Sequence, residues 1–295
     1  LAEGENGLWW RLHQASLWLA AEDWRAKQQE ILGLLRFCAE ANPSWSAPAL
    51  LLADLHERLG DVQRVEDVCR QALLANPSAA DVANRLLALL EGQGRFSDAN
   101  KVLGQIMVSP QLASAWQVRI ALGTGDFSRA IDELKLRASG DNQDATSRIQ
   151  LAQLVYRETK DVDQALGYLQ QAEAIASDAR LAMVRASILR AEGKAAEALQ
   201  TLDRYVADHN EFNAYWMRAV YLTEEGNLAR AEQDYRKLIT FAPNAEAGYE
   251  LLSGFYAGTE RLDQGIAAVE QGLQTYPKNL RLQRNLMLLL LRRAQ

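Results

Sequence analysis

The sequence predicts an all-α protein, an α-solenoid in which helix pairs repeat along the chain. Of the 295 residues, 48% are apolar and 24% are charged, which is typical of a folded globular chain. Six prolines and 18 glycines are too few for a loop-rich β-sandwich of this length, and Ala and Leu are abundant. Proline and glycine also recur at intervals of about 34 residues, which predicts about sixteen or seventeen helices averaging ~12–14 residues.

Proline gives the first sign of the repeat. Pro43, Pro77 and Pro110 are 34 and 33 residues apart, and the 133 residues from Pro110 to Pro243 correspond to four more units. A set of glycines recurs in step with the prolines: Gly60, Gly94, Gly125, Gly193 and Gly226. Proline disfavours helix in the residue before it, and glycine ends helices by taking the left-handed conformation. The two residue types therefore predict regularly spaced helix ends.

Each unit is predicted to hold two helices. The pattern is clearest over residues 212–243, where two apolar stripes at spacing i, i+4, i+7 flank Gly226. The stripes are Tyr215, Ala219 and Leu222 in the first helix, and Ala231, Tyr235 and Leu238 in the second. The small residues allow the two helices to approach closely, and the tyrosines fill the space beside them.

This order of residues resembles the tetratricopeptide repeat, a unit of about 34 residues with an aromatic residue, a Leu/Ala pair, Ala, a second aromatic residue and Pro. Residues 246–277 show it again, with Tyr249, Leu252, Ser253, Tyr256, Gly265 and Pro277. Two units, around 111–144 and 145–178, are degenerate, and the first unit lacks the glycine. The resemblance implies a right-handed superhelix in which the first helix of each pair lines a concave groove.

The predicted organisation is an N-terminal extension over 1–11, tandem repeats over 12–279 and a capping or truncated-repeat helix over 280–295. The repeats are expected at about 12–45, 46–79, 80–110, 111–144, 145–178, 179–211, 212–245 and 246–279. In the last helix, Leu286–Leu291 are consecutive apolar residues, which point all round the helix. This pattern predicts an apolar surface that another copy, another protein or a further repeat would cover.

Charge and hydropathy exclude several functions. The net charge is −6, which disfavours non-specific nucleic-acid binding. The longest apolar run, Leu286–Leu291, is far shorter than the ~20 residues that cross a bilayer. The chain begins at Leu1 rather than Met, so we expect a mature or excised fragment, and cytoplasmic and periplasmic locations both stay open. Arginine outnumbers lysine 25 to 7, which suggests a GC-rich bacterial genome.

Residue types that can act in catalysis or metal binding are scattered along the sequence. His13, His56 and His209 fall in three different units, without the spacing of metal ligands. Cys38 and Cys69 form no disulfide framework and are predicted to be small core residues, with a disulfide between them as the alternative. No glycine-rich phosphate loop joins a strand to a helix. The sequence predicts no enzyme, no metal site and no cofactor.

Helical geometry predicts which residues face the groove. Seven residues of the first helices are expected to contact the partner helix: Ala53, Leu87, Val118, Ala152, Ala186, Ala219 and Ser253. If they do, the residues that lie one position after, three before and four after each of them face the groove. The predicted partner-binding residues on this face and at its edges are Asn84, Trp116, Arg119, Tyr156, Arg157, Met183, Arg190, Trp216 and Met217. The alternative is that Trp216 and Met183 pack between adjacent repeats.

These residue types favour a protein–protein interaction scaffold that binds an extended or helical segment of a partner. Aromatic residues and arginine dominate binding hot spots. Arginines in the groove of an acidic chain further predict a partner with acidic character. The alternative function is a docking or regulatory arm of a larger envelope, secretion or polysaccharide-export machine, or of an enzyme whose catalytic domain lies outside these residues.

Overall fold

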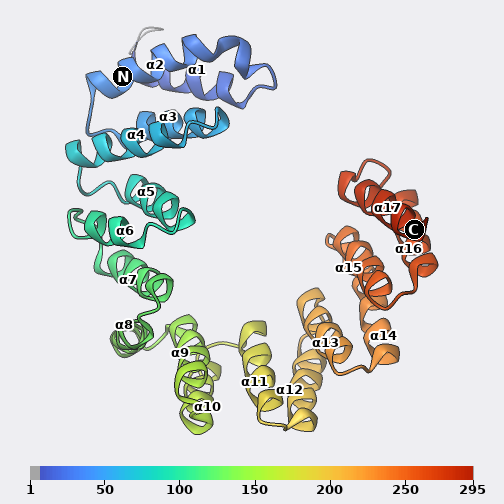
Figure 1. The fold of residues 1–295 in the computed structure, drawn as a ribbon. Helices are drawn as coiled ribbons and strands as arrows, with labels where there is room; N and C mark the ends of the chain where they lie inside the picture. The colour runs from blue at the N-terminus through green and yellow to red at the C-terminus, as the bar shows by residue number, and fades with distance from the viewer. Residues whose placement is uncertain (1–6, 295) are drawn as a thin grey trace. The chain divides into compact units, whose positions relative to one another are not determined.

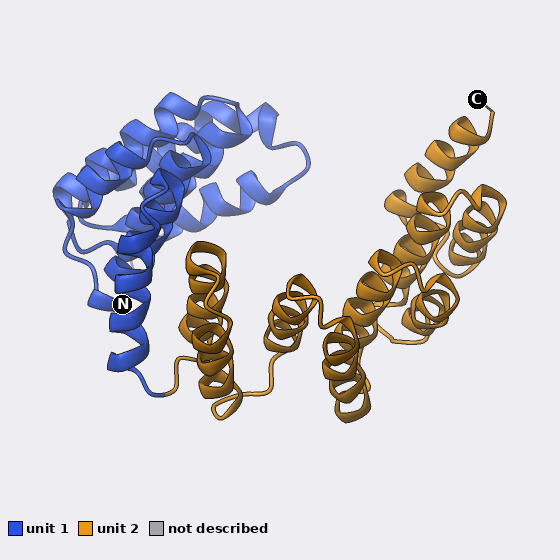
Figure 2. Cartoon of the chain, turned by 60° about the horizontal axis from the view of Figure 1, so that its bottom comes forward, with its two compact units in different colours: residues 1–142 blue, residues 143–295 orange. Residues whose placement is uncertain are grey.

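The computed structural model describes residues 7–294, and within this range the chain forms seventeen α-helices, one short 3₁₀ helix and no strand (Figure 1). The predicted all-α solenoid and its number of helices are confirmed. Residues 1–6 of the predicted N-terminal extension lie outside the described residues, and the first helix begins at Leu8. Contacts between helices divide the chain into two compact units, 1–142 and 143–295 (Figure 2).

Unit 1 holds four consecutive pairs of packed helices. They are α1 (Leu8–Ala20) and α2 (Gln28–Ala41), α3 (Ser46–Arg58) and α4 (Val62–Ala75), α5 (Ala80–Gly92) and α6 (Phe96–Leu103), and α7 (Pro110–Thr124) and α8 (Phe127–Gly140). The 3₁₀ helix η1 (Trp24–Lys27) links α1 to α2.

Unit 2 continues the pattern with four pairs and a last single helix. They are α9 (Ala145–Thr159) and α10 (Val162–Glu173), α11 (Ala179–Ala191) and α12 (Ala195–Asp208), α13 (Phe212–Glu224) and α14 (Leu228–Leu238), α15 (Ala245–Gly258) and α16 (Leu262–Thr275), and α17 (Leu280–Arg293). Among residues 7–294 the helices thus fit about eight tandem repeats, whose individual boundaries stay predictions.

The turn inside each pair explains the recurring glycines. Gly60, Gly94, Gly125, Gly193 and Gly226 all have φ between 69° and 77°, the left-handed region that glycine adopts without a steric penalty. In the degenerate unit over α9 and α10, Lys160 takes this place with φ 58°. The glycine is therefore missing from the sequence there, although the turn is present.

Small residues hold the two helices of a pair together, as the stripes predicted. Ala53, Ala152 and Ala219 are fully buried, and so is Ser253 in α15. Between successive pairs, Gly248 of α15 marks a close contact with α14, because a Cβ atom there would lie 2.7 Å from the backbone carbonyl carbon of Leu238. The core of the solenoid therefore runs along the seam between first and second helices.

The buried carboxylate of Glu66 gives unit 1 a pH-dependent contact. Arg95 Nη1 lies 2.6 Å and Arg70 Nη2 2.8 Å from its oxygens. The hydrogen bond from Arg95, together with that from Arg70, holds the pKa of Glu66 below its usual value despite burial. A lowered pKa in the folded state means that this stabilisation is present above the unfolded-state pKa near ~4.3 and is lost as the pH falls through the folded-state value.

We expect Glu66→Gln to lower the free energy of unfolding at pH 7, because it removes the charge that pairs with both arginines. The loss should be only about 1 kcal/mol, because both arginines are partly exposed and solvent screens the ion pairs. The variant should also lose less stability than the parent between pH 5 and the acid transition. Urea titrations at several pH values measure both effects. Equal acid sensitivity in the two proteins would contradict the assignment of this contact.

Candidate functional site

The groove-facing residues predicted in unit 1 form one contact between α5 and α7. Trp116 Nε1 donates to Asn84 Oδ1 over 2.8 Å, and the Arg119 guanidinium lies 4.0 Å from the centre of the Trp116 ring. Arg119 also pairs with Glu91, with 2.9 Å between Nε and Oε1. Trp116 is only 3% exposed, so its indole fills the space between the helices. The accessible surface of this cluster comes from Asn84 and Arg119.

Tyr156 and Arg157 lie near the end of α9. The Tyr156 hydroxyl donates to Glu192 over 2.8 Å, which joins α9 to the residue that follows α11 and raises the pKa of the tyrosine. Arg157 Nε lies 2.8 Å from the Glu158 carboxylate. Tyr156 is half-buried and Arg157 is exposed. Both residues therefore lie at the surface of unit 2, and the Tyr156 hydroxyl already makes a contact between helices.

Three of the four remaining predicted residues lie at a cavity of about 370 Å³ between α11 and α13, and Trp216 is not part of its lining. Met183, Arg190 and Met217 line it, although Met217 is buried in its wall. The other lining residues are Ala186, Ser187, Ala191, Leu202, Val220, Tyr221 and Glu224. Met183 is 46% exposed and Trp216, next to Met217 on α13, is 41% exposed. Packing between repeats therefore leaves both of these side chains partly exposed.

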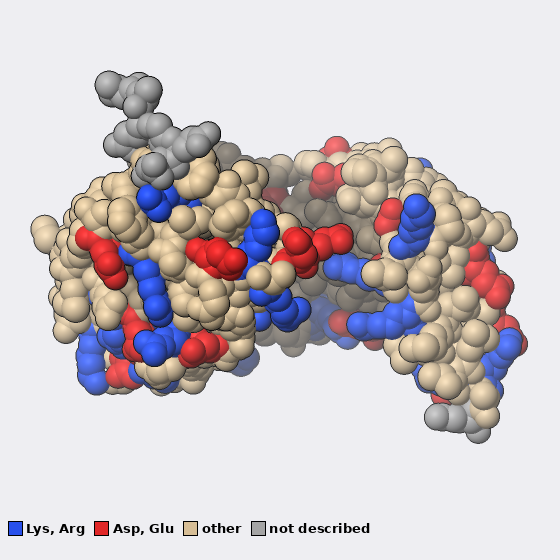
Figure 3. Space-filling view, turned by 90° about the horizontal axis from the view of Figure 1, so that it is seen from above, with Lys and Arg blue, Asp and Glu red and all other residues tan. Residues whose placement is uncertain are grey.

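The arginines have acidic partners within the chain, which the sequence interpretation did not foresee. Arg190 pairs with Glu224 and, over 2.6 Å, with Glu225 in the neighbouring helix pair. Arg119 and Arg157 pair with Glu91 and Glu158. The inference of an acidic partner from uncompensated arginines therefore loses its premise. Charged side chains of both signs are intermingled on the face shown in Figure 3.

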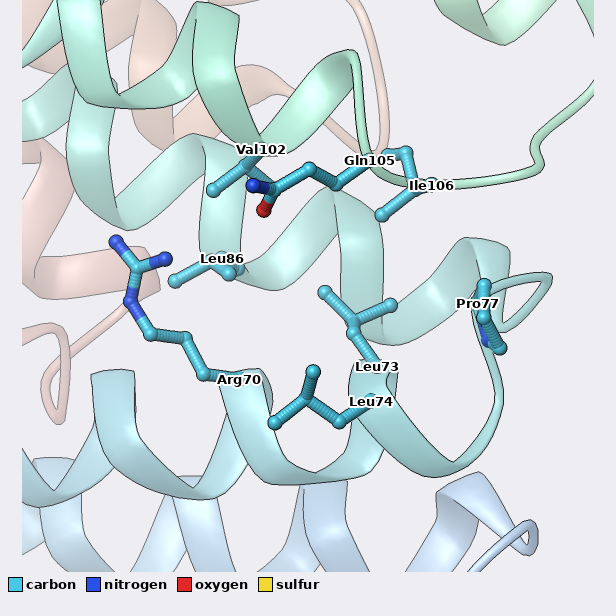
Figure 4. A pocket seen from close by; sticks show the side chains of 8 residues that line it. All are labelled: Arg70, Leu73, Leu74, Pro77, Leu86, Val102, Gln105 and Ile106. Atoms are coloured by element: carbon cyan, nitrogen blue, oxygen red, sulfur yellow. The ribbon is translucent and has the colours of Figure 1, made fainter.

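A second cavity, of about 220 Å³, lies in unit 1 between α4, α5 and α6, and sequence reasoning missed it (Figure 4). Its lining is largely apolar: Leu73, Leu74, Pro77, Leu86, Val102 and Ile106, with Arg70 and Gln105 at its edge. The cavity lies beside α6, which has only eight residues, whereas the other α-helices described have 11 to 15. Gly104, directly after α6, was the available signal.

Side chains of the types that bind metals or act in catalysis are dispersed in the structure. Among residues 7–294, no three His, Cys, Asp or Glu side chains are grouped as a metal site, and no helix in that range is long and apolar enough to cross a membrane. Cys38 and Cys69 are free thiols that are fully buried, as predicted, and burial raises the pKa of Cys69 to about 11. A neutral, enclosed thiol is a packing residue.

Consecutive packed helix pairs define an α-solenoid. Residues 183–246 match the family model of the tetratricopeptide repeat. These residues carry tetratricopeptide repeats, a module that generally binds proteins without catalysis, and the helices of residues 7–294 fit about eight such repeats.

The chain is similar to several solved structures, all at low sequence identity. A tetratricopeptide repeat protein from Parabacteroides merdae matches with a TM-score of 0.50 at 14% identity, over 82% of this chain and 97% of its own. PilW, described as a widely conserved type IV pilus biogenesis factor, gives 0.49 at 16%, over 69% and 94%. The C-terminal part of a repeat protein from Cytophaga hutchinsonii gives 0.46 at 14%, over 79% and 98%. No curated sequence matches the chain.

Proposed function

We propose that unit 2 binds a segment of a partner protein by taking an apolar side chain into the cavity between α11 and α13. The observation that carries the proposal is the convergence of exposed Met183 with Met217 and Val220 on one cavity, beside exposed Trp216. Tryptophan and methionine are enriched at protein interfaces, and a buried anchor in a pocket supplies much of the energy of binding.

The spacing of the residues supports a groove rather than an isolated hole. Met183, Ser187 and Arg190 are four and three residues apart on α11, so they share one face of that helix. Trp216 and Val220 are four apart on α13 and share a face in the same way. The small Ala186 at the base leaves room for the ligand. An extended or helical segment would lie across both faces.

An acidic group on the partner is the finer part of the proposal. Such a group would have to replace Glu224 or Glu225 beside Arg190, at a cost in the ion pairs already made. The partner's apolar side chain in the cavity therefore supplies most of the binding free energy, and a carboxylate would orient the bound segment. Asn84, Arg119, Tyr156 and Arg157 stay predicted partner-binding residues on the same face of their own helices.

A displayed library of random 15-residue peptides selected on the whole chain would test the apolar anchor. We expect selected peptides to share a large apolar residue, and Ser187→Trp, which fills the cavity from an exposed position, to weaken them about tenfold or more. The matched control is Ala267→Trp, at an exposed site in α16. Peptides that bind the Ser187→Trp variant as tightly as the parent would refute the site.

A charge test separates the acidic character from the anchor. If the selected peptides carry a carboxylate near the anchor, Arg190→Glu should weaken their binding and reduce its salt dependence. Unchanged affinity and salt dependence in Arg190→Glu would reject the acidic partner, while the result with Ser187→Trp would still stand.

A further inference from the structure

We infer that α17 is a second docking surface, which receives an acidic amphipathic helix of another protein. The helix spans the predicted range Leu280–Arg293 and packs against α15 and α16 through Leu282 and Leu289. Its opposite side is apolar and uncovered: Met287 is 55% and Leu291 57% exposed, and Leu280 is more exposed still. This surface is distinct from the cavity between α11 and α13.

The exposed residues form a stripe with the spacing of a helix–helix seam. Leu280, Arg284, Met287 and Leu291 follow one another at intervals of four, three and four, so they lie in a line along one side of α17. Leu288 widens the stripe. A stripe of this spacing is complementary to another helix that carries its own apolar seam.

The charge of α17 indicates the character of that helix. Between Leu280 and Arg293 there are four arginines and no acidic residue, although the chain as a whole has a charge of −6. Arg292 and Arg293 are bound to the Ala257 carbonyl and to Asp263, and they hold α17 on its own repeat. Arg281 and Arg284 are exposed, and Arg284 stands within the apolar stripe. A carboxylate of the docked helix would pair with it.

The same charges argue against a second copy and against a lipid surface as occupants. Pairing of α17 with α17 of a second copy would place arginines against arginines without any carboxylate to compensate them. A lipid surface suits a helix whose charges lie opposite its apolar face, but the opposite face of α17 is packed on the repeat, and Arg284 would be carried into the acyl boundary.

Two synthetic helical peptides with the same leucine seam, one with glutamate and one with lysine at the flanking positions, would test the inference by fluorescence anisotropy with the whole chain. We expect the glutamate peptide to bind about tenfold tighter or more than the lysine peptide. Leu291→Asp should abolish that binding, and Arg284→Glu should reverse the preference. Leu136→Asp, at an exposed leucine of α8, is the control that leaves binding unchanged.

Three results would overturn the inference. The first is equal binding of the two peptides, or a preference that Arg284→Glu does not change. The second is a dimer in sedimentation that Leu291→Asp dissociates, which would assign the surface to a second copy. The third is binding to phosphatidylserine vesicles that Leu291→Asp removes, without selective binding of the glutamate peptide. Circular dichroism of each variant verifies that its helices are intact.

Discussion

Asp234→Ala should lower the free energy of unfolding by about 3 kcal/mol, because it leaves the guanidinium of Arg218, whose side chain is only 13% exposed, without its main partner. Arg218 Nε and Nη2 each donate to a carboxylate oxygen of Asp234 over 2.8 Å, and Nη1 donates to Asp203 over 2.9 Å. Asp234 is 4% exposed, so solvent screens the pair very little. The contact joins α12, α13 and α14, and its loss affects two successive repeats.

The matched surface change is Asp263→Ala, which removes the partner of Arg293 where both side chains are exposed and should cost no more than about 0.5 kcal/mol. The double variant Arg218→Leu, Asp234→Leu should recover most of the stability lost in Asp234→Ala, since no unpaired charge stays buried. Urea denaturation of the four proteins gives the comparison. A loss in Asp234→Ala as small as that in Asp263→Ala would show that the pair is not a structural contact.

The fold could be predicted because the turn in five of the eight helix pairs carries a glycine, whose backbone preference is local. Gly60, Gly94 and Gly226 occupy left-handed turns, and the small residues of each stripe are buried where spacing placed them. Lys160 shows the limit of this signal, because a non-glycine residue takes the same turn when the helices on both sides impose it. The cavity beside α6 depends on how far one helix extends relative to its neighbours, which periodicity alone does not determine.

The sequence predicted which helix face carries the candidate site, but not how the charges on that face are paired. Spacing identified the face that carries Met183 and Trp216, yet Trp116 in α7 and Met217 in α13 are buried, because side-chain size and the adjacent repeat decide exposure. The ion pairs follow the repeat itself: Arg119 and Glu91 are 28 residues apart, and Arg190 and Glu225 are 35 apart. Pairing between equivalent helices at about one period would have indicated that these arginines are compensated.

The final expected result concerns the seam between first and second helices. Ala219→Trp should destabilise unit 2 by about 3 kcal/mol or more, because an indole cannot enter a close helix contact without moving the backbone. Ala219 is fully buried between α13 and α14 and packs in one cluster with Leu222, Ala231, Tyr235 and Leu238. Ala186→Trp, at the equivalent position of α11, should be damaging for the same reason.

The control for this change is Ala267→Trp, which adds the same volume at an exposed position in the middle of α16 and should cost less than about 0.5 kcal/mol. Chemical denaturation followed by circular dichroism compares the three variants with the parent. If Ala219→Trp were no more damaging than Ala267→Trp, the small residues would not be setting the approach of the paired helices. The register that places Met183, Trp216 and Val220 on the groove face would then fail with it, because that register is counted from Ala186 and Ala219.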